Sequence, residues 1–362
     1  MNNGTRINRR AMQLRLYTGI PWTGCLQRVR AASSRTRLIS ELSSTEQTLL
    51  EGLVMSTLAW RKISTLHPWG ITHVDPQPDR LVICMEGDVV QQWNPSRTEA
   101  KDLVEALLPR SYDRALESGI AGVRAQVEKD KVVLRSLQSP AQVVLDGIEP
   151  LRWTQAVKEV EAESADCGLT SWSRAAPDSW YATERSQMTR AWTSAWLYSG
   201  VPRRVGLVRT LGIPLLVTGW ENPASTAGSR LVLDPHHPAL GAPRSAANAQ
   251  GHRRFARLLA DPEWGLPLSV LDEDCHCRPD GSSDQCTTIL CSSLGWPGEL
   301  EVRTIQRHGE RLERMKGWGT SGEWKARRKL ALRVPSWADR ELDRKTGEPR
   351  AGRRVSGGAE SG

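Results

Sequence analysis

The densest group of residues able to do chemistry lies between positions 272 and 291, where four cysteines and one histidine follow three acidic residues. Thiolates and imidazole are ligands that Zn²⁺ prefers, and four of them around one ion make a closed structural site. The turn sequence Pro279-Asp280-Gly281 lies between them. The sequence therefore predicts a zinc site whose candidate ligands are Cys275, His276, Cys277, Cys286 and Cys291.

The spacing of these cysteines also allows a simpler interpretation. It reads C-x-C-x8-C-x4-C and lacks the paired C-x2-C knuckles of common zinc modules. Ordinary thiols without metal are therefore the alternative. No general base is evident beside the cluster, so a structural ion is favoured over a catalytic one. A metal-assisted hydrolase or nuclease remains the enzymatic alternative for this chain.

A second short motif, Gly319-Thr320-Ser321-Gly322, is similar to the segment around the nucleophilic serine of trypsin-like proteases. Such chemistry needs a histidine that accepts the serine proton and a carboxylate that orients the histidine. His67 or His73 with Asp75 precede the serine in the required order. However, residues 306–332 are predicted to be helical or irregular, whereas this protease fold is rich in strands. A surface loop is therefore the favoured interpretation.

Several motifs of nucleotide and metal chemistry are absent from the sequence. It contains no G-x-x-x-x-G-K-[ST], no G-x-G-x-x-G after a strand and no H-E-x-x-H. His236 and His237 are adjacent in a proline-rich turn. Neighbouring side chains generally point apart, which disfavours joint ligation of a metal. Nucleotide-dependent and zincin-type chemistry therefore have no support.

The formal net charge of +8 is distributed unevenly along the chain. Residues 1–40 hold eight arginines and no acid, and residues 301–362 hold sixteen lysines and arginines against nine acids. Arginine-rich segments bind phosphate backbones with release of counterions, and a guanidinium can fork onto a phosphate or stack on a base. The predicted nucleic-acid contacts of the first segment are Arg6, Arg9, Arg10, Arg15, Arg28, Arg30, Arg35 and Arg37.

Residues 1–40 show little helical periodicity, so they are predicted to form a disordered basic arm. An arginine-rich, acid-poor leader is also typical of a mitochondrial transit peptide, cleaved here near residues 35–40. A solvated leader without a partner is the third interpretation.

Near the other end, tryptophans are interleaved with two basic clusters, an arrangement typical of nucleic-acid surfaces. The second cluster consists of Lys325, Arg327, Arg328 and Lys329. A solvated helix face is the alternative. Residues 336–362 are rich in Gly, Ser and Arg and are predicted to be a disordered tail.

Composition indicates the compartment. The seven cysteines are odd in number and no secretory signal precedes them, which predicts free thiols in an intracellular, cytoplasmic protein. No run of about 18 apolar residues occurs, so no membrane span is expected. The chain has 15 Trp but one Phe, a bias that suits a compact viral or mobile-element genome or a GC-rich host.

The elements that must position these residues are predicted from periodicity and capping. Ser44-x-x-Gln47 and Ser96-x-x-Glu99 resemble capping boxes that open helices. Further helices are predicted around 153–160, 188–196 and 249–259, and a hairpin over 123–127 and 131–135. Single strands are predicted at 81–85, 143–145, 205–208, 214–220, 230–233 and 299–305. No sequence repeat is found.

These elements predict a mixed α+β fold of irregular order. They form one domain over 41–165 and a second, with the Cys/His cluster, over 180–335. The function predicted from the charge layout is a nucleic-acid-associated binding or structural protein that prefers RNA to DNA. A viral coat protein or nucleoprotein has this plan, self-associates into a homo-oligomer and resides in the cytoplasm or virion.

Overall fold

The computed structural model of the chain describes residues 3–33, 37–40, 44–60, 67–86, 98–112, 115–172, 179–187, 192–208, 216–222, 230–236, 251–275 and 285–305. Helices and sheets are mixed within these ranges, so the predicted α+β class is confirmed. Ser96 and the predicted basic cluster and tail beyond residue 305 lie outside them. None of the helices in the described ranges combines the length and apolar composition needed to cross a bilayer.

The first sheet has five strands in the order β1-β2-β7-β6-β5. β1 and β2 form a hairpin, and β5, β6 and β7 form an antiparallel meander whose last strand runs parallel to β2. A parallel pair needs a crossover connection, and helix α4 lies within it. The elements are η1 (Pro68–Gly70), β1 (Ile71–Pro76), β2 (Arg80–Met85), α4 (Glu99–Leu107), β5 (Val123–Glu128), β6 (Lys131–Ser136) and β7 (Gln142–Asp146).

The second sheet repeats this topology. Its order is β9-β10-β13-β12-β11, with a hairpin, a crossover helix and a meander whose last strand is parallel to β10. The elements are β9 (Leu216–Asn222), β10 (Arg230–His236), α9 (Gly251–Leu259), β11 (Leu268–Cys275), β12 (Gln285–Ser292) and β13 (Glu299–Ile305). The chain thus contains two copies of one ββαβββ arrangement. The sequence shows this only as Arg-Leu-Val, which opens both β2 and β10.

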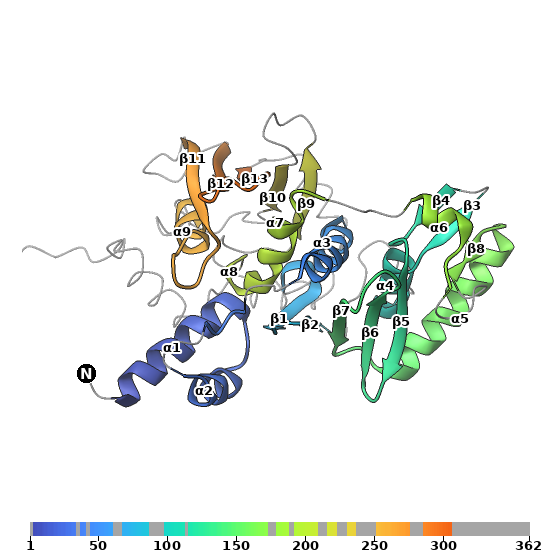
Figure 1. The fold of residues 1–362 in the computed structure, drawn as a ribbon, viewed down its shortest axis with the longest axis horizontal. Coiled ribbons are helices and arrows are strands. Elements are labelled where there is room, and N and C mark those ends of the chain that lie inside the picture. Colours follow the sequence, from blue (N-terminus) through green and yellow to red (C-terminus); the bar gives the residue numbers. More distant parts are fainter. Residues whose placement is uncertain are drawn as a thin grey trace, which may run out of the picture.

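A small third sheet lies at one end of the molecule (Figure 1); two of its strands, β3 and β4, are inserted between α4 and β5, and the third, β8, follows β7 in the chain. Helix α6 is tied to β5 by a buried ion pair of 2.7 Å between Arg124 and Glu184. The elements of this part are β3 (Arg110–Tyr112), β4 (Ala115–Ser118), α5 (Pro150–Asp166), β8 (Thr170–Ser171) and α6 (Ala182–Ser186).

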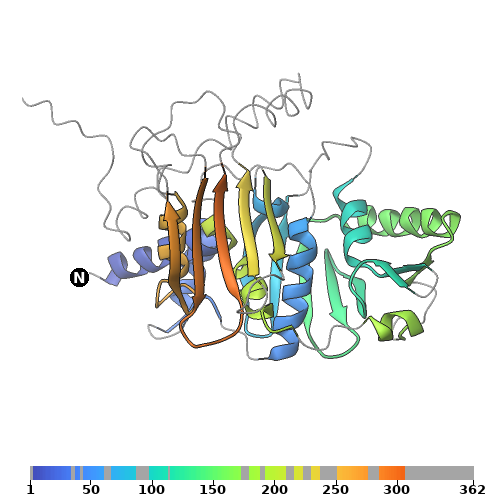
Figure 2. The same cartoon turned by 90° about the horizontal axis from the view of Figure 1, so that it is seen from above.

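The helices that precede the two repeats pack against each other. Helix α3 (Thr45–Trp60) contacts α7 (Ala195–Gly200) and lies between the two large sheets, where it touches β9 and β7 (Figure 2). Two helices that lead into the second repeat, η3 (Pro202–Arg204) and α8 (Val205–Val208), contact β1 of the first repeat. Each repeat is therefore covered partly by the helix that leads into the other.

A buried ion pair joins these helices. The Arg203 side chain donates from Nε and Nη2 to the two carboxylate oxygens of Glu51, at 2.8 and 2.7 Å. Ser199 donates a third hydrogen bond to Glu51, and Arg203 also donates to the carbonyl of Ser40. Arg203 is 2% exposed, so its charge is compensated almost wholly inside the protein.

The N-terminal segment differs from its prediction. It forms helices α1 (Asn3–Thr18) and α2 (Trp22–Ala31) instead of a solvated arm. Leu14 and Tyr17 are fully buried, and the Tyr17 hydroxyl donates to the carbonyl of Leu258 at 2.8 Å. A Cβ at Gly206 would lie 2.5 Å from the Leu16 carbonyl, so only glycine permits this close approach of α8 to α1. Tertiary packing, which periodicity does not reveal, stabilises the helix.

Two local predictions are also corrected. Residues 205–208, predicted as a strand from their valines, are the helix α8, because a four-residue segment takes its conformation from its packing. Helix α4 is capped by Thr98, whose hydroxyl accepts from the Lys101 amide at 3.2 Å, and not by Ser96. The Ser44 cap of α3 is confirmed by its 3.0 Å bond from the Gln47 amide.

Replacing Glu51 with alanine should strongly destabilise the fold, because Arg203 would remain buried without its carboxylate. We expect Glu51→Ala to lower the free energy of unfolding by about 3–5 kcal/mol, measured by urea denaturation. The exposed Glu159 on α5 provides the matched control, and Glu159→Ala should leave the midpoint unchanged. Equal midpoints for the two variants would show that the ion pair does not hold the helices together.

Candidate functional site

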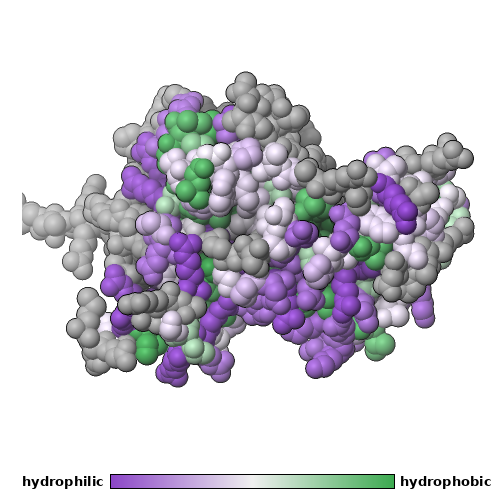
Figure 3. All heavy atoms as spheres, viewed as in Figure 1, coloured by the Kyte–Doolittle hydropathy of each residue, from purple (hydrophilic) through white to green (hydrophobic). Residues whose placement is uncertain are grey.

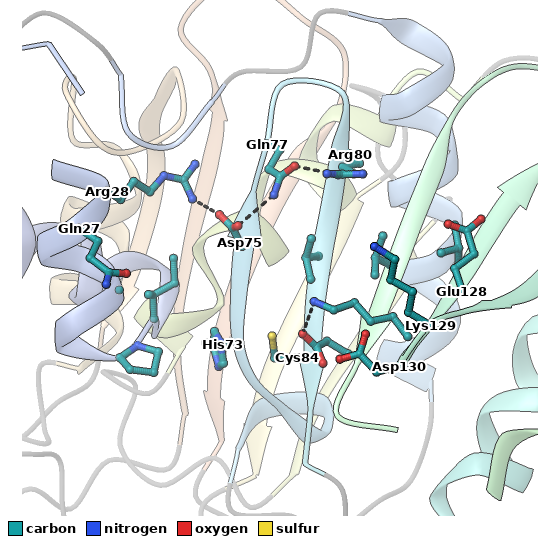
Figure 4. A pocket seen from close by; sticks show the side chains of 18 of the residues that line it. Gln27, Arg28, His73, Asp75, Gln77, Arg80, Cys84, Glu128, Lys129 and Asp130 are labelled. Atoms are coloured by element: carbon teal, nitrogen blue, oxygen red, sulfur yellow. Dashed lines mark hydrogen bonds and ion pairs between the residues drawn. The ribbon is translucent and has the colours of Figure 1, made fainter. Parts of the chain in front are cut away.

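A groove of about 920 Å³ lies between helix α2 and one face of the first sheet (Figure 4). Successive residues along the strands of this sheet face two different environments. Leu81 and Ile83 belong to the main core, whereas Val82, Val133 and Val144 form a separate small cluster on the opposite face. These three valines lie side by side in the register of β2, β7 and β6 and form the floor of the groove.

One wall of the groove is a chain of polar contacts that begins on α2. Arg28 forms an ion pair with Asp75 on β1, and Asp75 also accepts a 3.0 Å hydrogen bond from the Gln77 amide. The amide oxygen of Gln77 accepts from Nε of Arg80 at 2.7 Å. Across the described residues, the two terminal nitrogens of Arg80 make no hydrogen bond or ion pair. The chain therefore fixes the guanidinium through Nε and leaves its terminal nitrogens available.

The opposite wall is the β5–β6 hairpin. Lys131 donates to Asp146 at 2.7 Å, and this bond raises the pKa of Lys131 above its ordinary value. Lys129 begins the two-residue turn with φ of 58°, as the first position of a type II′ turn requires. Its side chain reaches over the groove (Figure 4) and forms no ion pair with any residue of the described ranges. Arg80 and Lys129 are thus the cations of the groove that form no ion pair within the described ranges, with Glu128 and Asp130 flanking Lys129 on the hairpin.

The lining of the groove includes a thiol and an imidazole, those of Cys84 and His73. Burial, and secondarily the Asp146 carboxylate, raise the pKa of Cys84 to about 12. The thiol therefore stays protonated at neutral pH and is a poor nucleophile or metal ligand. Nδ1 of His73 lies 3.0 Å from the Thr72 hydroxyl. Ser321, the nucleophile of the protease hypothesis, is outside the described residues.

Helices α1 and α2 carry six of the twelve predicted nucleic-acid contacts, and the first turns of α1 project from the body (Figure 1). Arg6, Arg9 and Arg30 are exposed, and no carboxylate in the described ranges pairs with them. Figure 3 shows hydrophilic surface on this side of the molecule. The sequence prediction therefore identified these cations, but it placed them on a disordered arm and not on anchored helices.

The other predicted arginines have different surroundings. Arg10 donates to the Ser33 carbonyl at 3.2 Å, and Arg28 is the residue that pairs with Asp75. Arg15 is half-buried and Arg37 is exposed. Arg35, Lys325, Arg327, Arg328 and Lys329 lie outside the described residues.

Three of the predicted zinc ligands, Cys275, Cys286 and Cys291, lie at the ends of a strand pair that the sequence did not reveal. The register of β11 and β12 places Cys275 directly opposite Cys286, whereas Cys291 lies opposite Ser269. Cys286 and Cys291 are five residues apart on one strand, a separation of about 16 Å. Cys291 therefore cannot share an ion with the other two, which corrects the predicted ligand set. Its Sγ lies 3.5 Å from the Ser269 hydroxyl instead.

His276 and Cys277 are outside the described residues, and within those residues no three His, Cys, Asp or Glu side chains gather to hold a metal. The strands were missed because Asp272-Glu273-Asp274 at the end of β11 has low strand propensity. Zinc binding by Cys275, His276, Cys277 and Cys286 stays a prediction.

Metal analysis of single-cysteine variants tests this reduced ligand set. If Cys275 and Cys286 share a zinc ion, Cys286→Ser should remove most of the zinc that co-purifies with the chain. Cys291→Ser should leave the zinc content unchanged, because Cys291 lies at the far end of the strand. Wild-type protein without stoichiometric zinc, or equal losses in the two variants, would contradict the hypothesis.

Thiol reactivity tests the environment of the groove. Cys167 is exposed, whereas burial raises the pKa of Cys25 and of Cys84 to about 12. At pH 8 iodoacetamide should alkylate Cys167 about a hundredfold or more faster than Cys84, because the thiolate reacts. The Cys84 rate should rise as the pH approaches 12, as followed by peptide mass spectrometry under conditions where the fold persists. Fast labelling of Cys84 at pH 8 would show that the groove thiol is ionised.

No protein-family model matches this chain, and neither a characterised protein nor a solved structure is significantly similar to it. Its function therefore has to be inferred from the geometry and charge of its own residues.

Proposed function

We propose that this protein binds nucleic acid through the phosphate backbone, with helices α1 and α2 as the contact surface. The observation that supports it is the set Arg6, Arg9 and Arg30, which are exposed, lack a carboxylate partner in the described ranges and stand on helices anchored to the core. No acidic residue occurs in the first 40 positions to repel a phosphate. Each phosphate contact releases condensed counterions, which supplies the binding free energy.

Because α1 and α2 are anchored, their arginines lose less conformational entropy on binding than arginines of a disordered arm would. A disordered arm loses conformational freedom when it binds, whereas arginines on a docked helix lose only side-chain freedom. Tyr17 and Leu14 fix α1 to the body before any ligand arrives. The surface is therefore largely preorganised for a polyanion.

The preference for RNA follows from the composition. The bias toward Trp and against Phe suits a compact viral or mobile-element genome. Viral coat proteins and nucleoproteins place basic segments on genomic RNA. Self-association in the cytoplasm or in a virion belongs to the same proposal. Light scattering of the purified chain with and without RNA tests it, since a protein that remains monomeric in both states would not be a shell protein.

Removing the three exposed arginines should weaken binding and reduce its salt dependence. For Arg6→Gln/Arg9→Gln/Arg30→Gln, we expect the logarithmic slope of affinity against salt to fall by about two, since each lost contact to single-stranded RNA removes about 0.7. The measurement is fluorescence anisotropy with a 30-nucleotide single-stranded RNA at several salt concentrations, on protein freed of co-purifying nucleic acid.

The matched control changes net charge equally at a distance from α1 and α2. Arg152, Lys158 and Arg185 are exposed on α5 and α6, so their combined replacement by glutamine should leave the slope unchanged. Equal effects of the two triple variants would mean that net charge, and not this surface, drives binding. Absence of binding by the wild-type protein at moderate salt would overturn the proposal.

A further inference from the structure

We infer that the groove on the first sheet is a subsite for one unstacked nucleotide of a single RNA strand, with its phosphate on Arg80 and Lys129 and its base over the valine floor. The inference rests on the proposed function and adds a site and a strand preference to it. The supporting observation is a difference between the two repeats in the surroundings of equivalent arginines.

Both repeats place an arginine at the same position. Arg80 is the first residue of β2 and Arg230 is the first residue of β10, and each is followed by Leu-Val. Arg230 lies beside Glu299 on the parallel neighbouring strand, and two residues further Val232 lies beside Glu301. The Arg230 side chain donates to both carboxylates, at 2.8 and 3.0 Å. In the second sheet, two carboxylates of the protein itself therefore neutralise the charge of Arg230.

The first sheet lacks these carboxylates. Arg80 lies beside Gln142 and Val82 lies beside Val144, so an amide and a valine occupy the positions of the two glutamates. The contact with Gln77 nevertheless holds the Arg80 guanidinium in place through Nε. A fixed guanidinium with unpaired terminal nitrogens matches the two oxygens of a phosphate. The ligand would thus supply the anion that Glu299 and Glu301 supply in the other repeat.

The remaining lining combines a second cation, hydrogen-bonding groups and an apolar floor with two carboxylates, Glu128 and Asp130, that flank Lys129. Lys129 adds a second cation from the facing wall, and Gln27 on α2 and His73 on β1 offer hydrogen-bonding groups. Val82, Val133 and Val144 give an apolar floor apart from the main core. The groove measures about 920 Å³, within the range of about 300–1,000 Å³ of ligand pockets, and its lining is more charged than that of most such pockets.

The same geometry favours a single strand over a duplex. A base can reach the floor between α2 and the β5–β6 hairpin only when it has left its stack and its pairing partner. A duplex would meet only the rim and the arginines of α1 and α2. Single-stranded RNA is therefore expected to use both surfaces and duplex RNA only one.

The decisive variant installs the carboxylate of the second repeat in the first. Gln142→Glu should pair with Arg80 as Glu299 pairs with Arg230, and Arg80→Gln removes the cation itself. The probes are a 12-nucleotide single-stranded oligouridylate and a 12-base-pair RNA duplex, at equal ionic strength. Both variants should lower single-strand affinity about tenfold, the usual effect of losing one charge-assisted hydrogen-bonded contact, and leave duplex affinity unchanged.

The controls separate this inference from the proposed function. Gln126 is exposed on the same face, so Gln126→Glu adds the same charge away from Arg80 and should change neither affinity. Inorganic phosphate at equal ionic strength should not displace the oligonucleotide, and displacement would mark a small-anion site instead. Unchanged single-strand affinity in Gln142→Glu and Arg80→Gln, with unfolding midpoints like wild type, would overturn the subsite alone. Binding of neither probe by the wild type would overturn both proposals.

Discussion

The contact between Glu51 and Arg203 is the constraint on which the arrangement of the two large sheets depends. Both side chains are almost fully removed from solvent, so each charge is tolerated only in the presence of the other and of the surrounding donors. Such a contact has little freedom to slide, because a shift of one helix turn would leave both groups unpaired. It therefore fixes the register of α3 against η3, which follows α7 directly, and with it the placement of the first repeat on the second.

Gln47 extends this constraint from the helix to the sheet. Its side-chain amide donates to Glu51 at 2.7 Å and to the carbonyl of Gln142 at 2.9 Å, and its oxygen accepts from the Gln142 amide at 3.0 Å. The beginning of β7 is thereby attached to α3. Since β7 supplies part of the groove floor, the site on one face of the sheet is positioned by a polar network on the other.

Local sequence rules predicted the elements whose pattern is self-contained. The β5–β6 hairpin, the apolar face of α4 and the strand β13 follow from alternation, capping and turn residues, and the structure confirms them. The rules failed where packing decides. Helix α1 is stabilised by burial of Leu14 and Tyr17 against distant elements, and β11 contains three consecutive acids, which have low strand propensity.

The candidate site was foreseen only in part. The run of arginines at the start of the sequence identified the exposed cations of α1 and α2. Arg80 was missed because the proposed subsite depends on the absence of carboxylates at the facing positions of β7. Those positions become neighbours of Arg80 only in the folded sheet. The recurrence of Arg-Leu-Val at positions 80 and 230 was the one trace of it in the sequence, and three residues are too few to establish a repeat.

The hydrogen bond from Tyr17 to Leu258 spans 241 residues of chain. At about 5–20 residues per second, the ribosome makes Leu258 roughly 12–50 s after Tyr17. During that interval α1 can pack on α2, β1 and α8 as each is made, but the Tyr17 hydroxyl lacks its final acceptor. The docking of α1 is thus completed only after α9 has been made, well after its exposed arginines have left the ribosome.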